Sequence, residues 1–277
     1  MEVISENRCF DGIQGVYKHR SETCQCDMTF GLFLPAEARD NPVPVLWYLS
    51  GLTCTHENAM VKAGAQTWAA EQGIALIFPD TSPRGSDVAD DDAYDLGKGA
   101  SFYLNATQKP WAPHYQMWDY VARELPKLAF ESFALDQKRQ AITGHSMGGH
   151  GALTLAMGLE NRYRSVSAFS PICNPTGADW GRKQFSAYLG DNEDPWQSHD
   201  ASVMMREVGF DGPVLVDTGT NDQFIDLLRP ETLAEATNAR RQQSLIRLQH
   251  GYDHSYFFVS TFMEDHITFH AEALYDK

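Results

Sequence analysis

The strongest structural signal in the sequence is Gly144-His145-Ser146-Met147-Gly148-Gly149. It follows a run at 139–143 that is suited to a strand, and it precedes an Ala/Leu-rich segment at 151–159 that is suited to a helix. A Gly-x-Ser-x-Gly turn between strand and helix projects the serine hydroxyl from the end of a sheet and leaves backbone N–H groups free. We interpret Ser146 as a nucleophile; the alternative is a glycine-rich turn whose serine only caps the helix.

Strand-like and helix-like segments alternate on both sides of this turn, which is typical of a mostly parallel sheet covered on both faces. Apolar runs predict strands at 43–50, 74–80, 139–143, 165–170, 213–217 and 244–249, with antiparallel strands at 12–19 and 28–35. Helices are expected near 58–72, 115–133 (with a kink at Pro126), 151–159, 231–242 and 256–274. Residues 81–113 are predicted to form a long functional loop. Together these elements predict a single α/β-hydrolase domain over residues 1–277.

Composition fits that prediction and excludes several other classes of protein. The 277 residues are 43% apolar and 21% charged, which suits a large core rather than a disordered chain or a coiled coil. The net charge of −15 disfavours nucleic acid and anionic membranes as partners. Residues 1–8 show no secretory signal and the apolar run at 43–52 is too short to span a bilayer, so we expect a cytoplasmic protein.

The cysteines predict reduced thiols. Their number is odd and their spacing irregular, unlike a disulfide framework or a zinc site; they are Cys9, Cys24, Cys26, Cys54 and Cys173. The spacing of Cys24-x-Cys26 is too tight to indicate a metal site by itself, so no metal is expected.

A nucleophilic serine needs a base and a carboxylate, which follow it in the order Asp or Glu, then His, in this fold. The expected base is His254, in a loop between the last strand and the last helix, and His250 is the second choice. His266 and His270 lie four residues apart on the last helix, a spacing that could bind a metal, but a partly exposed helix face explains it better.

The expected carboxylate is Asp222, which lies directly beyond the strand at 213–217. Asp217 inside that strand and Asp226 in the following turn are weaker candidates, with structural roles as the alternative: pairing within the sheet and capping a helix. Two backbone N–H groups are expected to form an oxyanion hole. One belongs to Met147, after the nucleophile, and the other to Leu52, in the loop after the strand at 43–50.

Longer stretches resemble the S-formylglutathione hydrolase family, also called esterase D, almost from end to end of the chain. The most specific are Tyr48-Leu49-Ser50-Gly51-Leu52-Thr53-Cys54-Thr55, Pro79-Asp80-Thr81-Ser82-Pro83-Arg84-Gly85, Phe102-Tyr103-Leu104-Asn105-Ala106-Thr107 and Gly251-Tyr252-Asp253-His254-Ser255-Tyr256. The family's triad maps onto Ser146, Asp222 and His254, and its oxyanion donors map onto Leu52 and Met147. Ser101 departs from the family pattern, where glycine is expected, and 171–179 matches it only loosely.

The resemblance implies hydrolysis of S-formylglutathione to glutathione and formate, the last step of glutathione-dependent formaldehyde removal. It also implies a cytosolic homodimer without a metal or an organic cofactor, which cleaves small aryl esters as well. The rival interpretations are a general short-chain carboxylesterase, an acyltransferase and a binding module with a relic triad.

Several other residues each have a functional and a structural interpretation. Cys54 is either a thiol near the site or a small buried side chain. Trp180 either walls the substrate channel, as the resemblance suggests, or packs in the core. Arg84, Lys98 or Lys183 would bind a glutathione carboxylate, or carry a solvated surface charge.

Overall fold

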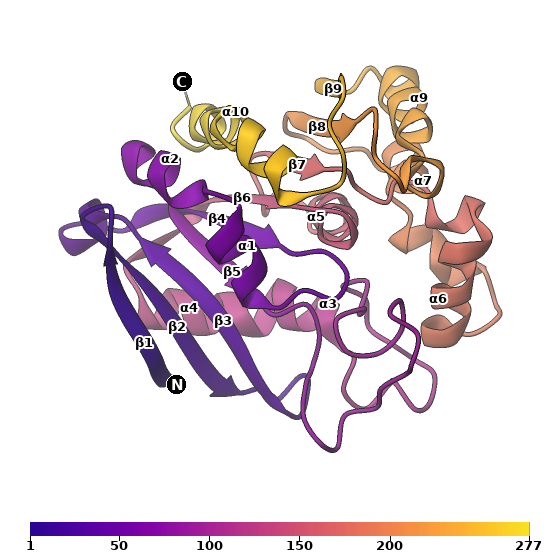
Figure 1. Cartoon of the computed structure of the whole chain (residues 1–277), viewed down its shortest axis with the longest axis horizontal. Coiled ribbons are helices and arrows are strands. Elements are labelled where there is room, and N and C mark those ends of the chain that lie inside the picture. The colour runs from indigo at the N-terminus through magenta and orange to yellow at the C-terminus, as the bar shows by residue number, and fades with distance from the viewer. Residues whose placement is uncertain (277) are drawn as a thin grey trace.

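A computed structural model describes residues 1–276 of the chain. The strands of this described part form one sheet in the order β1-β2-β3-β5-β4-β6-β7-β8-β9 (Figure 1). They are β1 (Glu2–Cys9), β2 (Gly12–Arg20), β3 (Asp27–Leu34), β4 (Val43–Leu49), β5 (Ala75–Pro79), β6 (Leu135–Gly144), β7 (Val166–Phe169), β8 (Val214–Gly219) and β9 (Ser244–Gln249). The first three strands pair antiparallel with one another, β3 pairs antiparallel with β5, and the remaining pairs are parallel.

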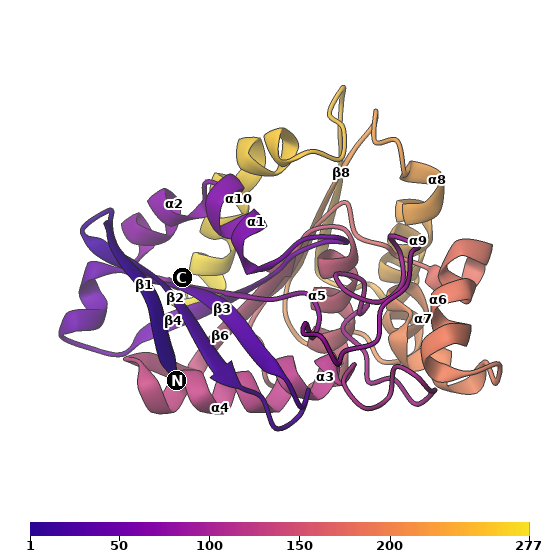
Figure 2. The same ribbon diagram turned by 60° about the horizontal axis from the view of Figure 1, so that its bottom comes forward.

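Helices cover both faces of this sheet (Figure 2). They are α1 (His56–Lys62), α2 (Ala65–Gln72), α3 (Met117–Asp119), α4 (Leu125–Ser132), α5 (Met147–Gly158), α6 (Asp179–Leu189), α7 (Ala201–Glu207), α8 (Ile225–Leu228), α9 (Pro230–Arg240) and α10 (Tyr256–Leu274), with a π-helical turn at Tyr120–Glu124 and short 3₁₀ segments at Ala36–Arg39, Pro175–Gly177 and Asp194–His199. The mostly parallel sheet with helices on both sides confirms the predicted fold class. Within residues 1–276, no helix is both long and apolar enough to cross a membrane.

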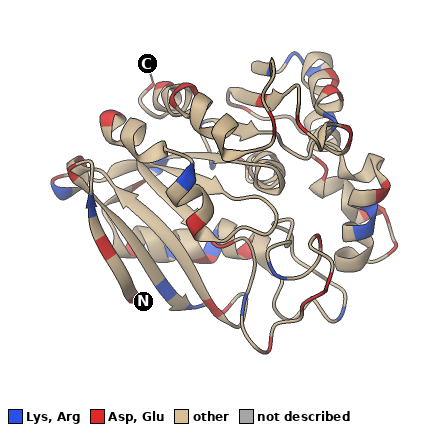
Figure 3. Cartoon of the chain, viewed as in Figure 1, with Lys and Arg blue, Asp and Glu red and all other residues tan. Residues whose placement is uncertain are grey.

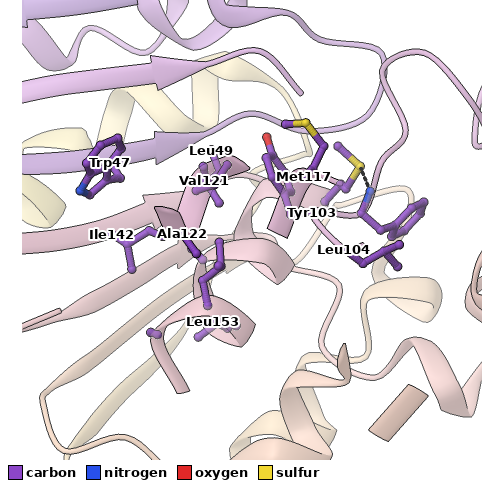
Figure 4. Close-up of a cluster of buried hydrophobic side chains, with 14 of the residues drawn as sticks. Trp47, Leu49, Tyr103, Leu104, Met117, Val121, Ala122, Ile142 and Leu153 are labelled. Atoms are coloured by element: carbon purple, nitrogen blue, oxygen red, sulfur yellow. Dashed lines mark hydrogen bonds between the residues drawn. The ribbon is translucent and has the colours of Figure 1, made fainter. Parts of the chain in front are cut away.

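The central strand β4 shows how the core is divided between the two faces. Trp47 and Leu49 point into a cluster beneath α4 and α5, whereas Leu46 and Tyr48 point into a second cluster beneath α1, α2 and α10. Side chains alternate across a strand, so a continuous apolar run marks a strand buried on both faces. Figure 4 shows part of the first cluster, where strand side chains such as Ile142 meet those of the covering helices. Figure 3 shows the charged residues mainly on outer helices and loops, with β4 and β5 free of charge.

Two predicted helices form close to their expected ranges, but neither is a regular α-helix throughout. The helix expected at 58–72 is broken into α1 and α2 at Gly64, whose φ of 67° lies in the left-handed region that glycine adopts without strain. The helix expected at 115–133 contains a π-helical turn at Tyr120–Glu124. Pro126 follows that turn directly, inside the continuous helical run, and it has no N–H to donate to the preceding helical turn.

Several elements gave no sequence signal. Strand β1 lies at the edge of the sheet with most of its side chains exposed, so it lacks the alternation that reveals a half-buried strand. The helices α6 and α7 were not predicted between β7 and β8. Helix α5 begins directly after the serine turn, at Met147. The helical signal in the sequence begins only at Gly151, because the glycines of the first turn have a low helix propensity.

The direction of the parallel strands determines where a ligand site can form. Strands β4, β6, β8 and β9 run in the same direction, so the loops that follow them meet at one edge of the sheet. Open α/β sheets bind their ligands beyond the carboxyl ends of the strands. All the catalytic and oxyanion residues predicted above lie in these loops or directly after them.

Candidate active site

Ser146 occupies a sharp turn between β6 and α5. Its φ of 59° and ψ of −120° lie where residues other than glycine are strained by about 1–3 kcal/mol. A Cβ at Gly144 would lie 2.2 Å from Gly148 O, and a Cβ at Gly148 would lie 2.0 Å from Leu49 O. The turn can therefore form only with glycine at both positions. The Ser146 side chain makes no helix-capping hydrogen bond, which argues against the alternative that it is a mere cap.

Asp222 and His254 form a close buried pair. His254 Nδ1 lies 2.6 Å from Asp222 Oδ2, and the two side chains are 10% and 0% exposed. Burial alone would raise the pKa of Asp222, but the hydrogen bond and the charge of His254, with the Phe224 N–H, hold it below its usual value. A carboxylate that stays ionised keeps the proton of His254 on Nδ1 and leaves Nε2 free to accept another.

The His254 ring is held between two other rings. The centroid of His145 lies 4.6 Å away and that of Phe224 lies 5.0 Å away, nearly edge-on. Burial, helped by the nearby charge of His254, lowers the pKa of His145 to about 3, so His145 is neutral at physiological pH. No hydrogen bond joins the Ser146 hydroxyl to His254 in residues 1–276, although catalytic hydrogen bonds often tighten only when a substrate binds.

Ser146 and His254 line the same cavity, which has a volume of about 300 Å³. Its wall is mainly apolar and comes from several separate regions of the chain; the residues are Gly51, Leu52, Thr53, Cys54, Tyr94, His145, Ile172, Trp180, Phe224, Leu227, Leu228, Ser255 and Tyr256. A larger open groove of about 1230 Å³ lies where β8 and β9 begin, away from the carboxyl ends of the strands, and none of the predicted site residues lines it. The smaller cavity is therefore the candidate active site.

Two backbone N–H groups beside Ser146 have no acceptor in residues 1–276, those of Leu52 and Met147. The loop that carries Leu52 approaches the serine so closely that a Cβ at Gly51 would lie 3.1 Å from Ser146 Cβ. The loop is fixed by a hydrogen bond from Tyr103 Oη to Ser50 O, 2.8 Å long. Unpaired N–H groups held in a rigid loop and at a helix start suit the stabilisation of an oxyanion.

Cys54 and Trp180 both lie at the cavity. Burial raises the pKa of the Cys54 thiol, so it is not a thiolate at neutral pH. The Trp180 ring packs edge-on against Phe102 at 5.7 Å, and its Nε1 is buried without an acceptor. Both interpretations given above therefore apply to each residue, because each packs against its neighbours and also lines the cavity.

The three cations considered for a glutathione carboxylate do not line the cavity. Arg84 donates to both carboxylate oxygens of Asp80, at 2.9 and 3.0 Å, and to Cys54 O. Lys98 pairs with Asp90 at 3.5 Å and Lys183 pairs with Asp95 at 2.8 Å. Each of these cations has a carboxylate partner, and the Lys183 side chain is still 47% exposed. Binding of a glutathione carboxylate by one of them therefore stays a prediction that the cavity wall does not support.

The weaker candidates lie apart from the cavity. His250 is exposed in the turn after β9, and Asp226 lies in the first turn of α8. Asp217 is fully buried and bonded by Arg247, so it has the structural role that was its alternative.

His266 and His270 correct the prediction of a partly exposed helix face, because both are fully buried. His266 Nε2 lies 3.1 Å from Asp217 Oδ2, and its Nδ1 lies 2.8 Å from Ser167 Oγ. His270 is bonded to the hydroxyls of Ser165 and Ser167. Within the described chain, no group of His, Cys, Asp or Glu side chains is arranged to hold a metal.

Asp217 should make the fold sensitive to acid. Burial raises its pKa, but hydrogen bonds from His266 and Arg247 outweigh burial and lower it to about 2. A carboxyl group with a lower pKa in the folded state stabilises the fold above about pH 4, and this stabilisation, roughly 2 kcal/mol, is lost as the pH falls towards 2. In urea titrations, Asp217→Asn should therefore lose less unfolding free energy between pH 5 and 2.5 than the wild type or an Asp226→Asn control. Equal losses in all three would contradict this role.

Some cavity residues were missed by sequence reasoning. Tyr94, Ile172, Leu227 and Leu228 lie on loops and a short helix, where no local pattern distinguishes a cavity wall from ordinary packing. Phe224 and Tyr256 were closer to detection, since each lies two residues after a predicted site residue.

Comparisons with known proteins agree with this geometry. The Esterase family model matches residues 21–269. An S-formylglutathione hydrolase of Paracoccus denitrificans is 64% identical over 99% of this chain and 98% of its own length. The structure of an S-formylglutathione hydrolase from Agrobacterium tumefaciens, 46% identical, superposes with a TM-score of 0.97 over 99% of this chain and 100% of that one. A fluorophosphonate-binding serine hydrolase of Staphylococcus aureus, 18% identical, shares the fold with a TM-score of 0.75, covering 94% and 98% of the two chains.

Proposed function

Because the chain belongs to the Esterase family, and within it to the S-formylglutathione hydrolases, we propose that it cleaves S-formylglutathione to glutathione and formate. The observation that carries this proposal is the joint position of Ser146, the His254–Asp222 pair and two unpaired N–H groups around one cavity. We further propose that the reaction serves formaldehyde removal, in the cytoplasm, and that the enzyme is a homodimer.

The proposed reaction has two steps. Ser146 Oγ attacks the formyl carbon while His254 Nε2 takes the hydroxyl proton, and the resulting oxyanion is bound by the N–H groups of Leu52 and Met147. The C–S bond then breaks, and glutathione leaves as a thiol with the proton from His254. Water attacks the formyl-serine ester while His254 Nε2 takes its proton, and His254 returns that proton to Ser146 Oγ as the C–O bond breaks, which releases formic acid and restores Ser146 and neutral His254.

The cavity suits a small acyl group. Its volume of about 300 Å³ is at the lower end of the range for ligand pockets, and we infer that it receives the formyl end of the substrate. The peptide part of the substrate would then extend over the rim, where Tyr94 is 57% exposed and Phe224 is 37% exposed. The Trp180 ring lines the cavity and offers the substrate an apolar contact.

The second candidate is a general short-chain carboxylesterase. It is favoured by the mainly apolar cavity wall and by the absence, among the lining residues of the described chain, of a Lys or Arg side chain for glutathione carboxylates.

The ratio of catalytic efficiencies separates these two candidates. We expect kcat/KM for S-formylglutathione to exceed that for a short aryl acetate by two orders of magnitude or more, about 3 kcal/mol of differential transition-state binding. The measurement is steady-state kinetics on both substrates with the same enzyme preparation. Comparable efficiencies would instead support the general esterase.

Cys54 gives a further prediction, because it lines the cavity in the same loop as Leu52. Alkylation should block the substrate and reduce activity more than tenfold, although slowly, since a thiol with a raised pKa reacts poorly. Cys54→Ser should resist the reagent, while Cys173→Ser, at a fully buried thiol, should be inactivated like the wild type. Full activity of wild-type protein shown by mass spectrometry to be alkylated at Cys54 would contradict this expectation.

A further inference from the structure

Tyr256 lies between two parts of the proposed site: the loop that carries the Leu52 N–H and the rings that surround His254. It is the first residue of α10, two residues after His254, and it lines the cavity. Its ring centroid lies 5.4 Å from that of His145, and the His145 ring in turn packs on His254 at 4.6 Å. One end of Tyr256 therefore contributes to the packing that fixes the imidazole of His254.

The other end of Tyr256 reaches the oxyanion loop, residues 50–55. Its hydroxyl is buried without a hydrogen-bond partner in the described chain, and Tyr256 lines the cavity together with Cys54 of this loop. Ser50 and Cys54 are both near enough to influence the pKa of the Tyr256 hydroxyl, which burial raises. Ser50 Oγ is likewise buried and unpaired. Leaving buried hydroxyls unpaired is unfavourable, so a small shift that lets them bond to each other would be stabilising.

We propose that Tyr256 is a positioning residue that fixes the oxyanion loop relative to the His145–His254 pair. The inference rests on the proposed function and extends it, because none of the catalytic steps above uses Tyr256. The same side chain packs on His145, beside the base, and lines the cavity together with the loop that carries the Leu52 N–H.

The chemistry explains why such a link would matter. The oxyanion beside Leu52 and the positive charge on His254 develop in the same transition state, so their supports must be correctly spaced at the same moment. Small errors in the position of reacting groups are costly in rate. Gly51 packs directly on Ser146, so a displacement of this loop would be transmitted to the nucleophile as well.

Four variants separate the two ends of Tyr256. Tyr256→Phe removes the hydroxyl and keeps the ring, Ser50→Ala removes the facing hydroxyl, the double variant removes both, and Tyr256→Leu removes ring and hydroxyl together. Tyr252→Phe is the matched control, because Tyr252 packs against Phe258 and Phe262 and does not line the cavity. Each is assayed on S-formylglutathione and on a short aryl acetate, with circular dichroism to establish folding.

Tyr256→Phe should lower kcat about tenfold with KM changed less than twofold, because the hydroxyl acts on a loop used in the transition state. Ser50→Ala should have a similar effect, and the double variant should be no worse than either single one, as expected for two coupled groups. Tyr256→Leu should lose a further factor of about ten and shift the acid limb of the pH–kcat profile, since the rings that support His254 lose a neighbour.

The proposal is overturned if folded Tyr256→Phe has the kcat of Tyr252→Phe, if the two single effects multiply in the double variant, or if the loss is entirely in KM. Failure of the proposed substrate is distinguishable, because the wild type would then cleave only the aryl ester and the variants would be compared on that substrate. Retained activity of Ser146→Ala would overturn both the mechanism and the role of Tyr256.

Discussion

Ser146→Ala should lower kcat for S-formylglutathione by about a million-fold and change KM little, because it removes the only atom proposed to bond to the substrate. The residual rate would come from the oxyanion N–H groups acting on water. The backbone of the turn should persist, since alanine is strained at φ 59° no more than serine is. The unfolding free energy should therefore lie within about 1 kcal/mol of wild type.

Two measurements check this prediction. Steady-state kinetics on the thioester and on an aryl acetate should show the loss for both, with Ser260→Ala, at an exposed position of α10, as the matched control. A fluorophosphonate probe should label the wild type and the control but not Ser146→Ala. Retention of more than about one per cent of wild-type kcat would contradict nucleophilic catalysis by this serine, for which far larger losses are expected.

Asp222→Asn should lower kcat about ten-thousand-fold at pH 7 while leaving the fold intact. An amide can offer its NH₂ group to His254 Nδ1, which would place the imidazole proton on Nε2 and prevent that atom from accepting the proton of Ser146. The loss should be as large on aryl esters as on the thioester, since the tautomer of His254 matters for both.

The matched control for this prediction is Asp217→Asn, at the other buried carboxylate of the same strand and loop. Asp217 makes its hydrogen bonds to Arg247, Gln249 and His266, so its loss should reduce stability and affect kcat much less. Because the pKa of Asp222 lies below its usual range, the wild-type rate should not fall through protonation of Asp222 between pH 7 and 5. Equal kcat losses in the two variants would show that Asp222 acts only through the fold.

The candidate site was largely predictable because its parts are local. Gly144 and Gly148 are dictated by backbone contacts within one turn, and this turn can be recognised in the sequence without knowing what surrounds it. The positions of Asp222 and His254 followed from a rule about strand ends and chain order. The structure places these two residues 2.6 Å apart, as that rule expects.

Other expectations failed because local patterns do not show what a side chain meets. The spacing of His266 and His270 suggested one exposed face of a helix, yet that face is turned inward onto β7 and β8. Arg84 looked available for a substrate carboxylate until folding placed it on Asp80. The break between α1 and α2 at Gly64 could not be predicted either. Gly64 adopts a left-handed conformation there, which glycine permits but does not require.

The sequence by itself therefore determined most strands of the sheet, the serine turn and the order of the candidate catalytic residues, since steric limits and side-chain periodicity act over a few neighbouring residues. Only the tertiary structure decided the wall of the cavity, the ion pairs that occupy Arg84 and Lys183, and the position of Tyr256 between two parts of the site. These features depend on how elements far apart in the chain pack together. Packing decides which polar groups become buried and which partners lie within their reach.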